Sequence, residues 1–355
     1  VSGFFPNKIP NPDLKWERTG QFDIGLDLGL FNNRLRITTD YYKKKTTDLL
    51  YSVAVPATSG YQTMLKNIGS IENQGYELSI ESDNLTGAFS WTTAFNIAFN
   101  RNKVLELGGE EYKEMAEGDG HLKTGSVRRL IVGEPIGVFY GYRFDGIFQN
   151  EEECKQQTSS ASPIGVGLRR YKDLNGDGKV DAANDREILG DANPKFFGGL
   201  TNTFAYKGFE LNVFLQYSYG NKILNYNAME LENPTGGQNA YADMVNRWTP
   251  ENPSNIYPKA TTNRALLVSD RFIEDGSYLK LKTLSLSYSF PKINLKHIQG
   301  LRLYVTGQNL LTWTKYRGYD PEVSYRGAST LEAGEDFGGY PQSRTFMFGI
   351  KLDIK

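Results

Sequence analysis

The most specific chemistry in this sequence lies in a stretch of alternating oxygen-bearing side chains between residues 173 and 181. Its first, third, fifth and ninth positions carry Asp or Asn, and its sixth position is a glycine. Calcium prefers about six to eight oxygen ligands, and calcium-binding loops supply them at these positions, with a backbone carbonyl at the seventh. The spacing predicts a structural Ca²⁺ site in a loop spanning 149–195, with the ligands Asp173, Asn175, Asp177, Lys179 (through its carbonyl), Asp181 and Asp185.

The closing end of this loop departs from the usual calcium pattern. Position 12 should carry a bidentate acid, but Asn184 stands there, and Asp185 follows one residue later as the expected closing ligand. No helical pattern flanks the loop, so a bound ion is expected to stiffen it and not to act as a sensor. The alternative is a polar turn without metal, because Asp and Asn side chains readily bond to their own backbone.

A second group of side chains suits recognition of a polar solute. Aromatic rings beside amides and a guanidinium can stack on sugars and hydrogen-bond to them. These substrate candidates lie in two long loops, at 220–277 and 314–343, and are Tyr226, Asn239, Tyr241, Trp248, Tyr325 and Arg326. For each residue the alternative is ordinary loop packing or contact with a covering protein.

The sequence indicates no catalytic arrangement, so we expect a protein that is not an enzyme. The two histidines, His121 and His297, stand far apart without a companion motif. A glycosidase needs two carboxylates held roughly 5–10 Å apart on a rigid scaffold, and no such pair is indicated. The single cysteine, Cys154, excludes an internal disulfide and, with so few histidines, a zinc cluster. A net charge of −1 without a long basic run argues against nucleic-acid binding.

The elements that carry these loops are strands in which apolar and polar residues alternate. In the segment 18–30 the apolar residues are Phe22, Ile24, Leu26, Leu28 and Leu30, with small or polar residues between them. The apolar face of such a strand can meet a protein core or lipid, and the polar face then meets water. The mean hydropathy of −0.49 offers no stretch for a membrane helix, whereas barrel strands hide their hydrophobicity in alternation.

The alternation predicts eleven strands, at 18–30, 34–50, 73–83, 89–102, 124–132, 136–148, 196–206, 209–219, 278–290, 301–313 and 344–354. Short and long connections then alternate, provided that the segment 124–148 is divided at Gly133-Glu134-Pro135. Outer-membrane barrels have short periplasmic turns at one end and long extracellular loops at the other. The pattern therefore favours an all-β fold, an antiparallel transmembrane β-barrel with the C-terminus on the short-turn side.

Two other folds share part of this pattern. A soluble, secreted β-sandwich that binds glycans through its loops has the same alternation, but it would bury Leu26, Phe95 and Leu215, which a barrel leaves exposed to lipid. A closed barrel of eleven strands is the weaker alternative, because single-chain bacterial barrels have even strand counts.

Several motifs, in order along the chain, resemble those of SusC-like TonB-dependent transporters. They include Asn11-Pro12-Asp13-Leu14-Lys15-Trp16-Glu17, Gly133-Glu134-Pro135-Ile136-Gly137, Asp173-Leu174-Asn175-Gly176-Asp177-Gly178, Asp275-Gly276-Ser277-Tyr278-Leu279-Lys280-Leu281-Lys282, Gly307-Gln308-Asn309-Leu310 and Gly318-Tyr319-Asp320-Pro321-Glu322. The resemblance implies a 22-stranded barrel around a plug domain. Residues 1–355 would form its C-terminal part with about eleven strands, and the plug domain and first strands would belong to an N-terminal half outside this chain.

The same resemblance implies a function in the bacterial outer membrane. The full protein would import an oligosaccharide, or a peptide, with a SusD-like surface lipoprotein closing over the extracellular loops, among them 149–195 and 220–277. TonB would supply energy by acting on the plug, and outer-membrane lipid would surround the barrel. The soluble glycan-binding sandwich is the alternative function.

Overall fold

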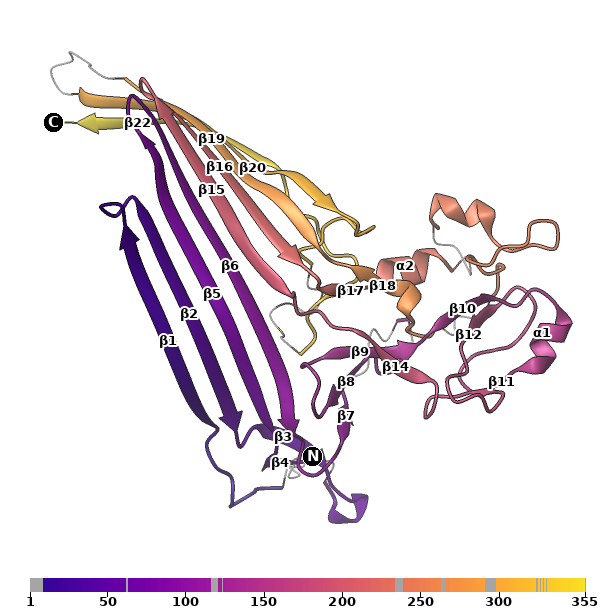
Figure 1. The fold of residues 1–355 in the computed structure, drawn as a ribbon. Coiled ribbons are helices and arrows are strands. Elements are labelled where there is room, and N and C mark those ends of the chain that lie inside the picture. Colours follow the sequence, from indigo (N-terminus) through magenta and orange to yellow (C-terminus); the bar gives the residue numbers. More distant parts are fainter. Residues whose placement is uncertain are drawn as a thin grey trace, which may run out of the picture.

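Nine antiparallel strands form one large sheet (Figure 1). The structure is a computed structural model that describes residues 9–61, 63–115, 121–122, 124–233, 239–262, 266–290, 298–323, 325, 327, 329 and 331–354. The strands follow the order of the sequence, and they are β1 (Arg18–Leu30), β2 (Leu35–Thr47), β5 (Ser70–Thr86), β6 (Phe89–Glu106), β15 (Phe196–Tyr206), β16 (Phe209–Tyr219), β19 (Tyr278–Ser289), β20 (Ile298–Thr314) and β22 (Thr345–Ile354). Each strand pairs with the next, so the sheet is a series of hairpins.

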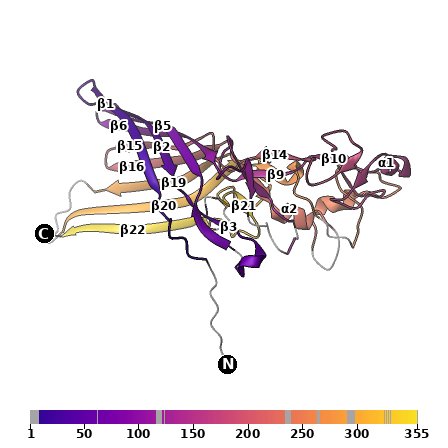
Figure 2. The same cartoon turned by 90° about the horizontal axis from the view of Figure 1, so that it is seen from below.

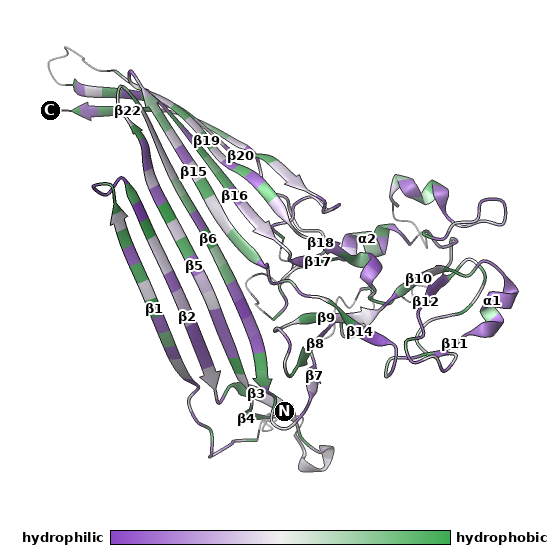
Figure 3. Cartoon of the chain, viewed as in Figure 1, coloured by the Kyte–Doolittle hydropathy of each residue, from purple (hydrophilic) through white to green (hydrophobic). Residues whose placement is uncertain are grey.

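The register of the sheet brings like residues together across neighbouring strands. One row runs from Ile24 to Tyr41, Tyr76 and Phe99, and it is apolar and aromatic throughout. The adjacent row, formed by Gly25, Asp40, Glu77 and Ala98, is small or acidic. Figure 3 shows the resulting green and purple bands along β1 and β2. Since side chains alternate between faces of a strand, the sheet has one apolar face and one polar face.

The polar face is held by side-chain contacts between strands. Arg36 of β2 pairs with Glu81 of β5, with 3.0 Å between Nε and Oε2. The Tyr42 hydroxyl lies 3.2 Å from Oδ1 of Asn100 on β6. The Tyr42 ring lies over Gly75 of β5, where any Cβ would collide with it, so this close approach requires glycine. These contacts fix the register of β2, β5 and β6.

Within the described ranges, the apolar face has no protein layer over it. Leu26 is 52% exposed, and Phe95 and Leu215 are half-buried, with none of the three in the apolar core. The β-sandwich alternative, which requires these residues to be buried, is therefore wrong. The fully buried apolar side chains lie mostly in the connections, with Phe139, Leu224 and Phe272 among them. Apolar side chains on a sheet face without a core are what lipid contact requires.

Two of the strands expected from the sequence do not join the sheet. Residues 124–132 and 136–148 were expected to cross the membrane, but β6 pairs directly with β15, and the chain between them does not cross. The large sheet thus contains nine strands and not eleven. The expected division between membrane-spanning strands at Gly133-Glu134-Pro135 is therefore wrong, because 107–195 is one long connection between β6 and β15. Short and long connections still alternate, and Ile354 still lies on the short-turn side.

The reason for this difference is burial on both faces. Two short strands, β8 (Arg128–Ile131) and β9 (Val138–Tyr142), occupy this segment, and most of their residues are buried without alternation. The backbone at Gly141 lies so close to Val268 that a Cβ on Gly141 would collide with the Val268 carbonyl oxygen. The backbone N–H of Tyr142 donates to that same oxygen at 2.9 Å. A strand packed on both sides by protein cannot also face lipid.

The connections contain the remaining elements. They are β3 (Leu50–Ala54), η1 (Ala57–Ser59), β4 (Thr63–Asn67), β7 (Tyr112–Glu114), β10 (Phe144–Ile147), α1 (Glu151–Gln156), β11 (Thr158–Ser159), β12 (Arg169–Tyr171), β13 (Lys179–Val180), β14 (Arg186–Gly190), β17 (Lys222–Asn225), α2 (Tyr226–Leu231), η2 (Ala242–Asn246), η3 (Asp270–Phe272), β18 (Ile273–Asp275) and β21 (Glu335–Asp336). Seen from below, β9, β10, β14, α1 and α2 gather beyond one end of the long strands (Figure 2). None of the helices in the described ranges has both the length and the apolarity to cross a membrane.

Candidate functional site

The three longest connections, 107–195, 220–277 and 315–344, pack together as one unit, which we call the connection domain. Their apolar core contains Phe139 from the first connection and Leu224, Tyr226 and Phe272 from the second, and Phe337 from the third packs against it. Strand β17 pairs with β18 and, in parallel, with β21, which joins the second connection to the third. The long connections therefore form a folded unit with a fixed surface at one end of the sheet.

A buried ion pair ties the first connection to the third. Arg128 Nε lies 2.9 Å from Glu335 Oε1, and their side chains are 3% and 2% exposed. The guanidinium also donates to the carbonyls of Gly137 and Ala333 and lies 4.1 Å from the centre of the Phe139 ring. Burial lowers the pKa of Arg128, and Glu335 opposes that effect. Each of its nitrogens has a fixed acceptor, so this arginine has a structural role.

A second charged cluster ties the second connection to the third. The Glu232 carboxylate, which is 0% exposed, lies 2.7 Å from Arg271 and 2.8 Å from Arg317. Arg317 also pairs with Glu274 at 2.8 Å. Burial lowers the pKa of Arg317, but the hydrogen bonds that it donates to Glu274 and Glu232 outweigh that effect and raise its pKa.

The residues predicted to bind calcium form a closed, acid-rich turn between β12 and β14. Asp185 is 0% exposed, and its two carboxylate oxygens accept from the backbone N–H groups of Leu174 at 2.8 Å and Asp181 at 2.7 Å. Asp173 accepts from two glycine N–H groups at 2.7 Å. Hydrogen bonding from the backbone of Asn184 lowers the pKa of Asp181, which keeps this carboxylate charged.

The predicted ligands lie in one turn, but their oxygen atoms do not surround a common position for an ion. Asp177 accepts from the Lys179 N–H at 2.8 Å, and Asp181 lies 3.1 Å from the Lys179 ammonium. Within the described part of the chain, no three His, Cys, Asp or Glu side chains come close enough together to hold a metal ion. The local bonds are those of an Asx-rich turn, so calcium binding stays a prediction.

The structure separates the predicted solute contacts into buried and exposed groups. Tyr226 is 0% exposed in the core of the connection domain, and Trp248 is 9% exposed and donates from Nε1 to Gln149 at 3.0 Å. Tyr241 is half-buried against the same core. Burial indicates packing roles for these three, and a solute contact is compatible with the exposed Asn239 and Tyr325. Arg326 lies outside the described residues.

Sequence reasoning did not identify the charged residues that hold the connection domain together. Arg128 and Glu335 belong to no local motif, because their pairing depends on a contact 207 residues apart. One signal was available. Two consecutive arginines, Arg128 and Arg129, interrupt the apolar pattern of the expected strand 124–132. Charged residues on both faces of a strand argue against lipid contact.

Comparisons with known proteins agree with this fold. A family model for the TonB-dependent-receptor-like β-barrel matches residues 1–310. The chain is 40% identical over 99% of its length to TonB-dependent receptor P3 of Formosa agariphila, and covers 36% of it. It is 30% identical over 98% of its length to TonB-dependent receptor SusC of Bacteroides thetaiotaomicron, and covers 33% of it. The solved structure of the RagAB peptide transporter matches 97% of this chain and 36% of that chain, with a TM-score of 0.77 and 27% identity.

The chain therefore belongs to the TonB-dependent receptor β-barrel family and is an outer-membrane protein. The resemblance to SusC-like transporters and the antiparallel barrel fold expected from the sequence are confirmed. The family is one of receptors and transporters and not of enzymes. The chain spans about a third of the length of the curated relatives that it matches.

Proposed function

We propose that this chain forms part of the barrel wall and the extracellular loops of a TonB-dependent importer of oligosaccharides or peptides. The observation that carries the proposal is the division of the chain into two parts. The sheet presents an apolar face that no core of the described residues covers, and the long connections at one end share a core of their own. A wall in contact with lipid and a shaped surface outside it are what selective import requires.

A SusD-like surface lipoprotein is the proposed partner on the connection domain. The proposal is supported by similarity to SusC and to the RagAB peptide transporter. TonB is the proposed energy source, acting on a plug domain in an N-terminal part outside this chain. The ring of Tyr319, which is 81% exposed, is a proposed contact for a solute or for the lipoprotein.

Deletion of the gene for the full-length protein, followed by uptake measurements with labelled oligosaccharides and labelled peptides, tests the proposal. We expect selective loss of one solute class, restoration by the full-length gene, and the same loss in cells without TonB. Unchanged uptake of every oligosaccharide and peptide in the deletion strain would contradict it. Co-purification of a lipoprotein with the detergent-solubilised protein tests the partner separately.

We also propose that the 173–185 turn binds Ca²⁺ as a structural ion. Carboxylate and carbonyl oxygens are the ligands this cation prefers, and the backbone bonds to Asp173 and Asp185 leave further lone pairs on each carboxylate. Binding would require the Asp177 and Asp181 side chains to turn inward, and the hydrogen bonds of both within the described residues are to neighbouring residues of the turn.

A further inference from the structure

One arginine of the connection domain has no carboxylate partner among the residues that the structure describes. Arg169 of β12 places its Nη2 3.1 Å from the backbone carbonyl oxygen of Glu232, and its guanidinium lies 5.5 Å from the centre of the Phe272 ring. Its Nε is buried and has no hydrogen-bond partner in the described part of the chain. The residue as a whole is partly exposed, so the buried Nε belongs to a side chain that still meets solvent in part.

The neighbouring acids are already engaged by other arginines. The Glu232 carboxylate is shared by Arg271 and Arg317, and Glu274 pairs with Arg317. Among the described residues, this part of the domain therefore holds three guanidinium groups against two carboxylates, and Arg169 is the one without an ion pair. Burial lowers the pKa of Arg169, but a guanidinium keeps its charge under all ordinary conditions. Since burying an unpaired charge is costly, this position favours a negatively charged group.

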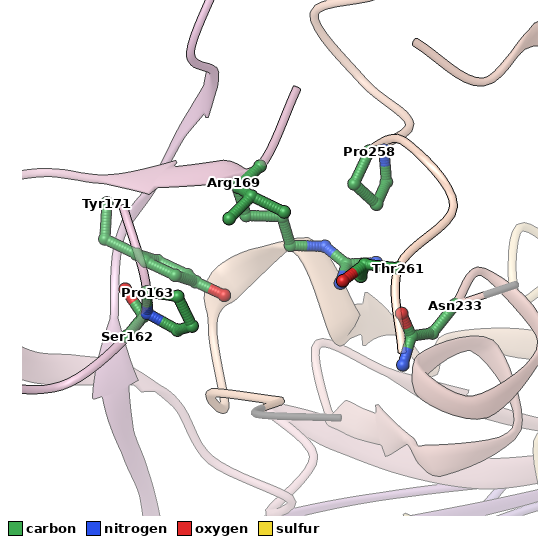
Figure 4. Close-up of a pocket in the computed structure, with 8 residues that line it drawn as sticks. Ser162, Pro163, Arg169, Tyr171, Asn233, Pro258 and Thr261 are labelled. Carbon is green, nitrogen blue, oxygen red and sulfur yellow. The ribbon is translucent and has the colours of Figure 1, made fainter. Parts of the chain in front are cut away.

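A cavity lies beside this guanidinium and is lined by groups that hydrogen-bond to anions. Its volume is about 30 Å³, which is room for roughly two water molecules or one small acidic group. Ser162, Tyr171, Asn233 and Thr261 line it together with Arg169, and the rest of the lining is proline and leucine. Figure 4 shows Arg169 extending toward Thr261, with the Tyr171 side chain reaching into the same region. Burial raises the pKa of Tyr171, so its hydroxyl stays protonated.

We propose that this cavity is an oxyanion site in which Arg169 binds a single carboxylate, either as a free ion or as part of an acidic solute. The guanidinium supplies the charge and a fork of N–H donors that matches a carboxylate. Hydroxyl and amide groups complete the shell without adding charge. The small volume selects one acidic group and excludes a whole sugar ring or aromatic side chain. This inference does not depend on which solute class the full protein imports.

The first test is titration of the detergent-solubilised full-length protein with sodium acetate at constant ionic strength, exchanged against chloride. Hydrogen exchange of the segments 162–171 and 258–261 is the readout. We expect saturable protection in the unaltered protein. Arg169→Met should weaken the apparent acetate affinity by about 10- to 100-fold, since a hydrogen-bonded charge contributes roughly 1.5–3 kcal/mol. The matched control is Arg170→Met, because Arg170 already pairs with Asp145 and Glu153.

A second variant keeps the test decisive if Arg169→Met fails to fold. Asn233→Asp changes no volume and places a carboxylate at the cavity, so it should fold and remove the acetate effect.

An oligosaccharide bearing one uronic acid, compared with its neutral counterpart, then distinguishes a free carboxylate ion from an acidic solute. Competition by the acidic sugar alone identifies a solute subsite, and acetate binding without competition identifies a free-ion site. The proposal is overturned if acetate protects the unaltered protein, Arg169→Met and Asn233→Asp equally. It is also overturned if acetate protects none of them.

Discussion

Lys280 Nζ lies 2.6 Å from Asp320 Oδ1, and the lysine side chain is only 1% exposed. The same ammonium lies 2.5 Å from Glu322 Oε2. Lys280 belongs to β19 and the two acids to the 315–344 connection, so the pair attaches the connection domain to the barrel wall. Both partners lie in motifs noted in the sequence, Asp275–Lys282 and Gly318–Glu322. The two motifs form one structural unit.

Replacement of Lys280 by Met should release this attachment. Removal of one member of a buried ion pair costs roughly 3–5 kcal/mol, because the remaining charges stay buried without a partner. A spin label at position 319, introduced as Tyr319→Cys in a background without other reactive cysteines, should become mobile in the full-length protein. Lys282→Met is the matched control, since it removes only the contact with Glu322 at 2.9 Å. An immobile label in Lys280→Met would show that the ion pair does not hold the segment.

The same attachment should be sensitive to acid. Burial raises the pKa of Glu322, but Lys280 and Lys282 outweigh burial, so its pKa lies below the ordinary value of 4.5. A carboxyl group whose pKa is lower in the folded protein binds fewer protons there than in the unfolded chain. Its contribution to folding stability is therefore present above the ordinary pKa and is lost as pH falls through the folded pKa. The label at position 319 should be immobile at pH 7 and become mobile below about pH 4. In Glu322→Gln the mobility should change less with pH, and an equal change in both proteins would assign the transition to another group.

Substitution on the apolar face should impair membrane insertion. Phe95 of β6 lies between Ile80 and Leu200 on that face. An arginine on the lipid face of a barrel costs about 2–4 kcal/mol near the bilayer centre. Phe95→Arg in the full-length protein should therefore lower the fraction folded into lipid vesicles, measured by heat-dependent electrophoretic mobility. Asn96→Arg, which places the same residue on the other face, should insert much better. Equal insertion would contradict the assignment of the two faces.

Calcium binding can be measured directly on the full-length protein by titration calorimetry. We expect one ion, accompanied by protection of the 173–185 turn from proteolysis. Asp177→Asn alters an exposed side chain and should weaken binding without unfolding the turn. Asp191→Asn, a matched change beyond the 173–185 turn, should bind as the unaltered protein does. A chelator without effect on proteolysis of the turn would mean that the acids form a polar turn only.

The strands were predictable where the pattern was local. Those at 18–30, 196–206 and 209–219 have the bounds that alternation predicts, because residues in contact with lipid on one face and water on the other must alternate. The segment 124–148 was not predictable in this way. Its environment depends on Val268 and Glu335, which are distant in sequence, and alternation of Val, Phe and Tyr does not distinguish lipid from a protein interior.

The candidate site was predictable only in part for the same reason. The aromatic residues of the 220–277 connection stood out by type, but side-chain type does not indicate burial. Tyr226 lies inside the core and Asn239 outside it. Arg169 carried no signal in the sequence, because what distinguishes it is that it forms no ion pair in the described structure, the nearby Glu232 carboxylate being shared by Arg271 and Arg317. That property belongs to the assembled connections and not to any motif.

The apolar core of this chain lies in its connections and not beneath its large sheet. The residues that keep the protein in the bilayer are thus largely different from those that shape its outer surface. Over evolutionary time, substitutions in the connection domain can remodel that surface while the strand register stays as it is. The Lys280 attachment is a point where the two sets of residues meet, so substitutions there must preserve both the strand and the connection domain.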